Sequence, residues 1–331
     1  MRAVVIPQFG DFQVLALKDV AIPDPGPYEI TIDVAYAGVN YAEVLFRKGV
    51  VSNLPLPFVP GIEVSGTIRA LGERVTGFRV GQLVAALSIG EGGGYAEVVK
   101  VPSQFVFPLD EVKESALDLA AAAAFPSNVT TAYLIVSEVS RMRQGETVLV
   151  HAAAGGVGSA LGQIARKLGA GCVMGTVCSK DKIEYAKSLG YDAVFLRDGH
   201  EQSVMELTRG QGVDIVVDPV GGSMRKTALQ VLKPFGRLVA MGNASDAEDV
   251  QQSINELWFT SKAVLGFNLQ QMSVYAPDLI SEAARKALSL VVRGDIRVDV
   301  TDILELQEAG EAHRRIEERI TTGKLVLKVR Q

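Results

Sequence analysis

The alternation of hydrophobic and polar residues changes character near residue 120. Before that point, short apolar–polar segments are separated by Pro and Gly. In Glu29–Ala35 every second residue is Ile or Val, which is the period of a half-buried strand. Val64–Ala70, Leu83–Ala86 and Ala96–Val101 are predicted to be further short strands. This part of the chain therefore indicates a barrel-like or sandwich-like β domain.

Beyond residue 120 the pattern becomes an alternation of strands and helices. Thr147–Ala152 is largely apolar, and Val157–Leu168 then places apolar residues at helical spacing. The same alternation continues with strands at Cys172–Val177, Ala193–Leu196, Val213–Asp218 and Arg237–Gly242, and helices at Asp181–Leu189, Glu201–Arg209 and Met224–Leu232. Parallel strands joined by right-handed crossovers produce this order, so we expect an α/β, doubly wound parallel sheet.

The chain end has a third pattern. Two amphipathic stretches, Pro277–Arg293 and Leu304–Thr321, precede a last strand at Leu325–Val329. We expect this strand to return to the first domain, which would make that domain discontinuous. The predicted domains are residues 1–120 with 269–331, and residues 121–268.

Composition excludes several classes of protein. The 331 residues carry a net charge of −5, which argues against a nucleic-acid-binding surface. No apolar run approaches the ~20 residues that span a bilayer, and the N-terminus lacks the pattern of a signal peptide. The two cysteines allow neither a disulfide framework nor a four-cysteine zinc site. We therefore expect a cytoplasmic protein with no membrane span.

The most informative segment is His-Ala-Ala-Ala-Gly-Gly-Val-Gly at His151–Gly158, between a predicted strand and a predicted helix. Small residues there let a pyrophosphate approach the backbone N–H groups at the helix N-terminus. The alternative is a tight strand-to-helix turn that binds nothing. The candidate pyrophosphate contacts are Ala154, Gly155, Gly156, Val157 and Gly158.

The end of the next strand bears on which dinucleotide would bind. An NAD site places an acidic residue ~20 positions after the glycines, to bind the ribose 2′-hydroxyl. Ser179 and Lys180 stand there, and a hydroxyl with an ammonium suits a 2′-phosphate. NADPH is therefore favoured over NADH. Asp181 follows directly and keeps NADH open, and Lys180 has the alternative of being a solvated residue at a helix start.

The glycine-rich string resembles the zinc-independent, zeta-crystallin-like quinone oxidoreductases of the medium-chain dehydrogenase/reductase superfamily. The resemblance implies a GroES-like, β-rich substrate domain, which is also the catalytic domain, and a Rossmann cofactor domain. Zinc-dependent relatives have a Cys and a His ligand where this chain has Asn40 and Ile62, so we expect no zinc. Other matching segments occur in the family's order: Ala37–Asn40, Pro60–Gly66, Val80–Val84, Gly92–Glu97, Thr130–Tyr133, Asp218–Gly222 and Gly323–Leu327.

The resemblance also implies roles for single residues. Asn40 would lie near the nicotinamide ribose and Thr131 beside the nicotinamide ring, while Ser179 and Lys180 would bind the 2′-phosphate. For Asn40 the alternative is a turn role. For Asn243 and Asn268 it is a capping or loop role, and for Arg319 it is a solvated charge. The further cofactor contacts that the family implies are Gly242, Asn243, Phe267, Asn268 and Arg319.

One departure from the family concerns the substrate pocket. Tyr41 follows Asn40, but the tyrosines that some members place shortly afterwards are missing. A more apolar pocket is the consequence, which leaves the preferred acceptor open. The positions where those tyrosines are sought hold Leu45, Phe46 and Val51.

Acid–base chemistry is sparsely represented. Of the three histidines, His151 is expected to be packed or close to the cofactor, while His200 and His313 are expected at the surface. A quinone or activated enone is already electrophilic, so hydride transfer needs mainly proximity in a dry site, and solvent can supply the proton. Asn40 or Tyr41 is the candidate donor to the developing oxyanion.

Three functions follow as hypotheses. The first is an NADPH-dependent oxidoreductase that transfers hydride to a quinone without zinc. The second is an NADPH-dependent reductase of enones or 2-enoyl thioesters, for which Arg47–Lys48 is the available cationic pair. The third is a non-catalytic, structural NADPH-binding protein. Ala263–Phe267 is predicted to be an edge strand of the Rossmann sheet, and its pairing across a two-fold axis would form a homodimer.

Overall fold

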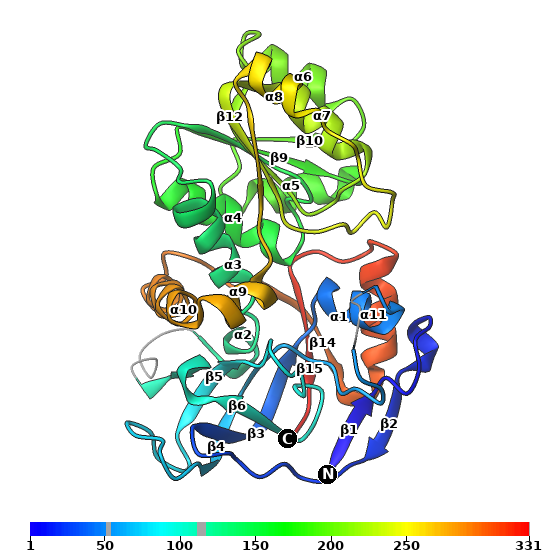
Figure 1. The fold of residues 1–331 in the computed structure, drawn as a ribbon, viewed down its shortest axis with the longest axis vertical. Coiled ribbons are helices and arrows are strands. Elements are labelled where there is room, and N and C mark those ends of the chain that lie inside the picture. The colour runs from blue at the N-terminus through cyan, green and yellow to red at the C-terminus, as the bar shows by residue number, and fades with distance from the viewer. Residues whose placement is uncertain (51–53, 111–116, 331) are drawn as a thin grey trace. The chain divides into compact units, whose positions relative to one another are not determined.

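The computed structural model describes residues 1–50, 54–110 and 117–330, so Val51 lies outside the described residues. The chain divides into two compact units (Figure 1). Unit 1 comprises Met1–Thr130 and Leu269–Gln331, and unit 2 comprises Thr131–Asn268. The first boundary between the two units thus lies after Thr130, whereas the sequence pattern predicts it after residue 120. The reason is that Ala120 and Ala124 pack against Val326 in the core of unit 1.

Unit 1 is built on a seven-stranded, mostly antiparallel sheet of order β14-β15-β3-β4-β5-β7, with β6 paired to β3. β15 pairs antiparallel with β3 and parallel with β14, so the C-terminal strand joins the sheet of the N-terminal segment, as its sequence predicts. A separate hairpin pairs β1 with β2. The strands are β1 (Arg2–Val5), β2 (Ala16–Asp19), β3 (Glu29–Gly38), β4 (Glu63–Leu71), β5 (Leu83–Leu87), β6 (Val98–Pro102), β7 (Val106–Pro108), β14 (Val300–Glu305) and β15 (Lys324–Lys328).

The helices of unit 1 include one that the apolar pattern does not reveal. α1 begins after Asn40 as its N-cap and ends before Gly49, whose φ of 73° is the left-handed conformation usual at helix C-termini. α3 runs across the division into unit 2. The helices are α1 (Tyr41–Lys48), α2 (Leu119–Ala122), α3 (Asn128–Leu134), α9 (Leu269–Tyr275), α10 (Pro277–Val292) and α11 (Ala309–Glu317), with short 3₁₀ turns at Phe12–Val14, Ser103–Phe105 and Leu306–Glu308.

Unit 2 contains the predicted parallel sheet. Its six strands have the order β10-β9-β8-β11-β12-β13, and every neighbouring pair is parallel. β13 is an edge strand, as expected. The strands are β8 (Thr147–Val150), β9 (Cys172–Val177), β10 (Ala193–Leu196), β11 (Val213–Asp218), β12 (Leu232–Ala240) and β13 (Ala263–Gly266). The helices are α4 (Gly156–Lys167), α5 (Ile183–Lys187), α6 (His200–Leu207), α7 (Ser223–Val231) and α8 (Ile254–Thr260), with a π-helix at Ile135–Val139 and a 3₁₀ turn at Lys180–Lys182.

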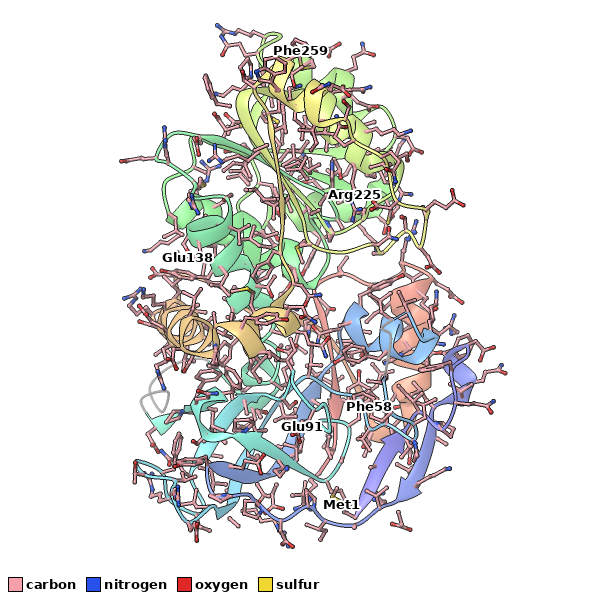
Figure 2. All side chains as sticks on the ribbon, viewed as in Figure 1. Met1, Phe58, Glu91, Glu138, Arg225 and Phe259 are labelled. Carbon is pink, nitrogen blue, oxygen red and sulfur yellow. The ribbon has the colours of Figure 1, made fainter. Side chains whose placement is uncertain are left out.

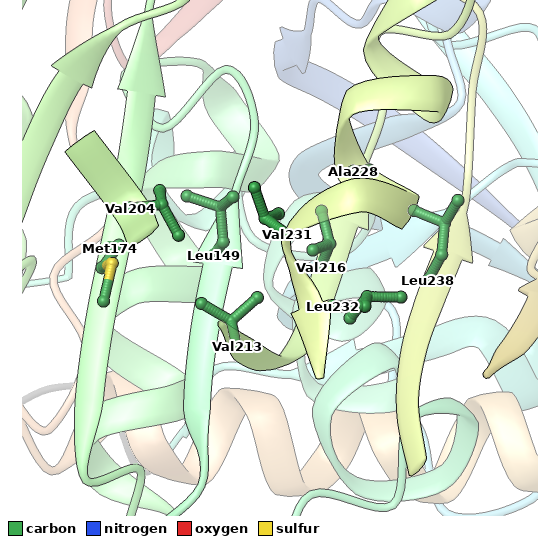
Figure 3. Close-up of a cluster of buried hydrophobic side chains, with 9 residues drawn as sticks. All are labelled: Leu149, Met174, Val204, Val213, Val216, Ala228, Val231, Leu232 and Leu238. Atoms are coloured by element: carbon green, nitrogen blue, oxygen red, sulfur yellow. The ribbon is translucent and has the colours of Figure 1, made fainter. Parts of the chain in front are cut away.

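Helices cover both faces of this sheet. On one face, buried side chains of α6 and α7 pack against the central strands (Figure 3). Met174 of β9 belongs to this cluster, so the next residue, Gly175, faces the opposite side, where Ala153 and Tyr191 lie against it. The Tyr191 hydroxyl donates to the carbonyl of Gly158 in α4 at 2.6 Å. This is the doubly wound arrangement that the sequence predicts.

Across the residues that the structure describes, we find no helix with the length and apolar character needed to cross a membrane.

Candidate functional site

The glycine-rich turn of unit 2 joins β8 to α4 at the carboxyl edge of the sheet. His151–Ala154 form the turn and α4 begins at Gly156. The turn is attached to the neighbouring strand, because the N–H of Ala153 donates to the carbonyl of Thr176 at 2.9 Å. Ala152 adopts a left-handed φ of 54°, which is uncommon for a residue with a side chain and lets the chain reverse in few residues. A tight and well-supported turn therefore presents the N-terminus of α4.

Two glycines of this turn are needed for different reasons. A Cβ added at Gly158 would lie 2.3 Å from the carbonyl oxygen of Ala152 and 2.9 Å from the backbone of Ala153. Glycine at 158 is thus required by the protein's own packing. A Cβ added at Gly155 would meet only that carbonyl oxygen, at 3.4 Å, and Gly155 has an ordinary φ of −84°. Nothing in the described chain requires glycine at 155.

The turn has the features of an anion-binding cradle. The first N–H groups of an α-helix have no partner within the helix, and Gly155, the N-cap of α4, has no side chain to bind them. The helix dipole also favours negative charge at this end. A Cβ at Gly155 would fill space that the protein leaves open, which is the arrangement a pyrophosphate needs. The residues present therefore fit a dinucleotide, and among the candidate contacts Ala154 is buried while Val157 is partly exposed.

The loop after β9 carries charges of both signs. Lys180 is exposed, and Ser179 forms the N-cap of the following 3₁₀ turn. A hydrogen bond from the Ser179 side chain is the main reason why the pKa of Asp181 lies below its ordinary value. The ammonium would attract a 2′-phosphate, whereas the ionised carboxylate beside it would oppose one. The loop thus carries one side chain that favours NADPH, Lys180, and one that keeps NADH open, Asp181.

The loops after β11 and β12 are tied together by polar contacts. Asp218 is buried and accepts from the N–H groups of Val220 and Gly221 at 2.8 and 3.1 Å. Burial nevertheless raises the pKa of the Asp218 carboxyl. Arg225, labelled in Figure 2, lies 3.5 Å from this carboxylate and donates to the carbonyl of Gly242 at 2.7 Å. The main chain at Gly242 is thereby held in place.

The asparagines expected to contact the cofactor differ in surroundings. Asn243 donates to the carbonyl of Ala247 at 2.9 Å and accepts from the Ser245 hydroxyl at 3.2 Å, so its amide stabilises its own loop. The N–H of Phe267 donates to the carbonyl of Ala240, which continues the sheet pairing beyond β13. Asn268 is exposed. The Asn243 amide thus contacts its own loop, and its role as a cofactor contact stays a prediction.

All three histidines are buried. His151 is fully buried with Nδ1 3.0 Å from the Thr176 hydroxyl, and burial lowers its pKa to about 3. The prediction that His200 and His313 lie at the surface is wrong. His200 packs its ring edge-to-face on His151, with 5.0 Å between centroids, and its Nδ1 lies 2.7 Å from the carbonyl oxygen of Arg197. His313 lies in α11 with Nε2 3.4 Å from the Tyr95 hydroxyl, and burial lowers its pKa to about 3. Polar neighbours in sequence did not reveal that these residues face inward.

The candidate site of unit 1 is a buried polar network around Asn40. The Asn40 Nδ2 donates to Glu63 Oε1 at 2.9 Å, and its Oδ1 accepts from Lys324 Nζ at 2.5 Å. Lys324 also forms an ion pair with Glu63. Glu43 accepts the Asn40 N–H at 2.8 Å, and an added Cβ at Gly38 would lie 2.5 Å from Glu63 Oε1, so glycine there leaves room for the carboxylate. Glu63 of β4 and Lys324 of β15 thus hold the Asn40 carboxamide, Glu43 of α1 holds the Asn40 N–H, and Gly38 of β3 leaves room for Glu63.

The other predicted site residues lie in different surroundings. Tyr41 is partly exposed at the start of α1 in unit 1, and Thr131 is buried in α3 at the start of unit 2. Arg319 lies just past the end of α11 in unit 1, where it is exposed and has a left-handed φ of 57°. Asn40 contacts buried charged residues for which the sequence predicted no role. The glycine turn and Ser179–Lys180 lie in the same unit.

Arg47 and Lys48, the candidate cationic pair, both form ion pairs with Glu317. The Arg47 side chain is fully buried, donates to the carbonyl of Gly10 at 2.8 Å and forms an ion pair with Glu317. Lys48 lies 3.2 Å from the same carboxylate. The buried Arg47 is thus unavailable as a cationic entrance, because α11 supplies one carboxylate that pairs with it and with Lys48.

Comparison with known proteins matches both units. The family model "Alcohol dehydrogenase GroES-like domain" matches residues 26–111, and the model "Zinc-binding dehydrogenase" matches residues 156–289. The quinone oxidoreductase of Pseudomonas aeruginosa is 33% identical over 96% of this chain and 97% of its own. The human synaptic vesicle membrane protein VAT-1 homolog-like is 34% identical over 99% of this chain and 81% of its own. The chain belongs to the quinone oxidoreductase family of the medium-chain dehydrogenase/reductase superfamily.

Solved structures agree with this family membership. The crystal structure of Escherichia coli quinone oxidoreductase complexed with NADPH matches with a TM-score of 0.90 and 26% identity, over 99% of this chain and all of the other. The quinone oxidoreductase fold of a GroES-like domain and a Rossmann-like parallel sheet is therefore confirmed. Family membership places the chain among oxidoreductases.

The zinc question arises from the name of one matched family model. Within residues 1–50, 54–110 and 117–330, no three or more His, Cys, Asp or Glu side chains are grouped so that they could hold a metal ion. Asn40 carries a carboxamide within the buried network, and Ile62 is buried and apolar. Neither residue offers the thiolate or imidazole that zinc prefers.

Three members of the network around Asn40 were not predicted from the sequence. Glu43, Glu63 and Lys324 are buried, although Glu and Lys are rarely buried unless they are paired. One local signal was available, since Asn40 followed three residues later by Glu43 is the spacing of a helix capping box. Nothing local indicates that Glu63 and Lys324 meet, because 261 residues separate them along the chain.

Proposed function

We propose that this quinone oxidoreductase relative is an NADPH-dependent oxidoreductase that transfers hydride to a quinone without zinc. The observation that carries the proposal is the open cradle at Gly155, at the N-terminus of α4, in a chain of this family. The E. coli relative solved with NADPH supports the choice of cofactor. The absence of zinc is proposed because Asn40 and Ile62 occupy the positions of a Cys and a His ligand.

The residues that would hold NADPH follow from the geometry of unit 2. The first N–H groups of α4 would bind the pyrophosphate, and Ser179 with Lys180 would bind the 2′-phosphate. The carbonyl and loop at Gly242 are held by Arg225 close to the same edge of the sheet. When bound, NADPH supplies the hydride. Discrimination against NADH depends on Lys180 outweighing Asp181.

The chain's own contribution is to hold polar groups in a fixed orientation. Asn40 is 9% exposed, and its carboxamide donates to Glu63 and accepts from Lys324. Because this orientation is already fixed, little side-chain entropy would be lost if the carboxamide formed a hydrogen bond to a reacting group. His151 and His313 have pKa values of about 3, so both are neutral imidazoles at neutral pH and neither is an imidazolium that could act as a general acid. Hydride addition converts a quinone to the hydroquinone anion, and we propose that this anion takes its proton from solvent.

Reduction of enones or enoyl thioesters is the second hypothesis, and the thioester form loses its main support. A thioester carrier brings phosphate groups that need an accessible cationic entrance. Arg47 is fully buried and both Arg47 and Lys48 pair with Glu317. We therefore expect little turnover of 2-enoyl-CoA, while a simple enone remains an alternative acceptor.

The experiment that tests the function measures NADPH oxidation by the purified, metal-free protein. Benzoquinone, a simple enone and 2-enoyl-CoA are compared as acceptors, with NADH as the control cofactor. Rapid turnover of NADPH with the quinone supports the proposal, and equal rates after treatment with a chelator support its independence from zinc. Turnover of the enone alone would contradict the quinone assignment. Tight NADPH binding without turnover of any acceptor would favour the structural, non-catalytic hypothesis.

We also propose that the chain forms a homodimer through the β13 edge of unit 2. None of the residues of α8 is buried, and Ile254, Trp258 and Phe259 are each more than two-thirds exposed. Figure 2 shows Phe259 at the surface, on α8. Exposed aromatic residues beside a sheet edge such as that of β13 are a liability in a monomer and a usual feature of a protein interface.

A further inference from the structure

The network around Asn40 contains one acidic group that the proposed reaction does not use. Glu43 is completely buried on the first turn of α1. Its carboxylate meets only hydrogen-bond donors among the contacts that the structure gives it. Oε2 accepts the Asn40 N–H at 2.8 Å, and Oε1 accepts the Ile62 N–H at 3.1 Å. The Asn40 Nδ2 approaches Oε1 at 3.4 Å, which is a long contact.

These contacts suit an ionised carboxylate and conflict with a neutral one. A protonated carboxyl carries an O–H that needs an acceptor. The carboxamide of Asn40 could offer its oxygen to Glu43 only by a half-turn that exchanges Oδ1 and Nδ2. That half-turn would direct the amide N–H₂ at the Lys324 ammonium, which is also a donor, and would break the 2.5 Å contact between Lys324 Nζ and Asn40 Oδ1. The charge state of Glu43 and the orientation of Asn40 are therefore coupled.

We propose that Glu43 is a positioning residue: its carboxylate holds the Asn40 carboxamide with the oxygen toward Lys324, and protonation of Glu43 releases that orientation and slows hydride transfer. The inference rests on the proposed function and on the expectation, from the family resemblance, that Asn40 lies near the nicotinamide ribose. It assigns no contact between Glu43 and a substrate. The effect is transmitted entirely through the Asn40 backbone and side chain.

Glu43 changes charge near neutral pH, and the charged and titratable groups that face it act on its pKa in both directions. Burial raises the pKa of Glu43 to about 7, with Glu63 of β4 adding to the increase and Lys324 of β15 opposing it. Tyr95 faces both carboxylates, and burial raises its pKa well above the ordinary value, so it stays neutral. His313, beyond the Tyr95 hydroxyl, has a pKa of about 3 and is also neutral at pH 7.

The test combines a direct titration with kinetics. The carboxylic acid C=O band in the infrared is followed between pH 5.5 and 8.5 for the wild type, Glu43→Gln and a control, Glu29→Gln. Glu29 is a matched control because it also accepts a backbone N–H, from Gly26 at 2.7 Å, and pairs with Lys100 at 3.1 Å. It stands at the opposite end of β3 from Gly38, roughly 30 Å away at about 3.3 Å per residue. Asp218 is a second buried carboxyl group with a raised pKa. It is unchanged in every variant, so its contribution to the infrared band cancels when the variants are compared.

We expect a carboxyl titration near pH 7 that Glu43→Gln removes and Glu29→Gln retains. As the pH is lowered through this midpoint, the kcat for NADPH and benzoquinone should fall by about tenfold per pH unit in the wild type and in Glu29→Gln, until it reaches the kcat of Glu43→Gln. Glu43→Gln should be slow and flat across this range. If Glu43→Gln only lowers the melting temperature and keeps the acid limb of the wild type, the inference is wrong.

A second variant keeps the inference testable if Glu43→Gln does not fold. Asn40→Ala removes the group through which Glu43 acts, so the infrared titration should persist while the step in kcat near pH 7 disappears. A persisting kcat step in Asn40→Ala would refute the coupling. The two proposals can also fail separately. A wild type that consumes no acceptor at any pH, but shows the titration, contradicts the proposed function. Rapid quinone turnover without a Glu43 titration contradicts this inference alone.

Discussion

The two glycines of the nucleotide turn allow cofactor binding to be separated from folding. Gly155→Ala adds a Cβ that meets one backbone atom at 3.4 Å, an ordinary van der Waals contact. The methyl group lowers the entropy of the unfolded chain by about 0.4–1 kcal/mol, and the weaker preference of alanine for an N-cap costs about as much. We therefore expect the stability of Gly155→Ala to stay within about 1 kcal/mol of the wild type.

The same methyl group occupies the space that a pyrophosphate would use. If it displaces the phosphate from a single N–H group, a charge-assisted hydrogen bond of about 1.5–3 kcal/mol is lost. We expect the Kd for NADPH to rise by roughly 10- to 150-fold. Isothermal titration calorimetry measures this directly, and a thermal melt of the unliganded protein reports stability.

Gly158→Ala is the matched control for this change. Its Cβ would lie 2.3 Å from a backbone oxygen and 2.9 Å from two further backbone atoms, which cannot move aside as a flexible side chain does. We expect destabilisation of about 1–3 kcal/mol, even though alanine is the better helix former. If Gly155→Ala binds NADPH within twofold of the wild type, the pyrophosphate does not use this cradle. If it melts as low as Gly158→Ala, the distinction between the two glycines is wrong.

Three further predictions follow from other parts of the molecule. Lys180→Ala should weaken NADPH binding at least fivefold and leave NADH binding unchanged in calorimetry, and equal loss of both cofactors would remove Lys180 from the 2′-phosphate site. The folded state binds the Glu43 proton more tightly, with a pKa of about 7 against an ordinary 4.5, so this residue's contribution to stability falls as pH rises from about 4.5 to about 7. In denaturant titrations Glu43→Gln should therefore gain about 3 kcal/mol relative to the wild type across that range, and an unchanged difference would contradict the shift. The double variant Trp258→Glu with Phe259→Glu should convert a dimer to a monomer in sedimentation velocity without loss of NADPH affinity, and a wild type that sediments as a monomer at all concentrations would refute the dimer.

Local patterns were sufficient wherever one element carries its own signal. The strand at Cys172–Val177 and the helix after the glycine turn lie where their periodicity predicts them, because apolar spacing reflects which face is buried. The helix at Tyr41–Lys48 was missed, because its buried face includes Glu43 and Arg47 rather than a regular apolar stripe. Polar residues that are buried in pairs do not show a hydrophobic period.

The amino-acid sequence alone was enough to predict the fold class, the family and the glycine turn, because these follow from short local motifs and from the order in which the motifs occur along the chain. Only the tertiary structure revealed that Glu63 and Lys324 meet at Asn40 and that Glu317 neutralises Arg47. It also revealed that His200 and His313 are buried. These facts depend on which distant segments fold against one another, and burial then decides the charge state: a carboxylate that would be ionised in water has its pKa raised to about 7 at Glu43 because the surrounding protein excludes solvent.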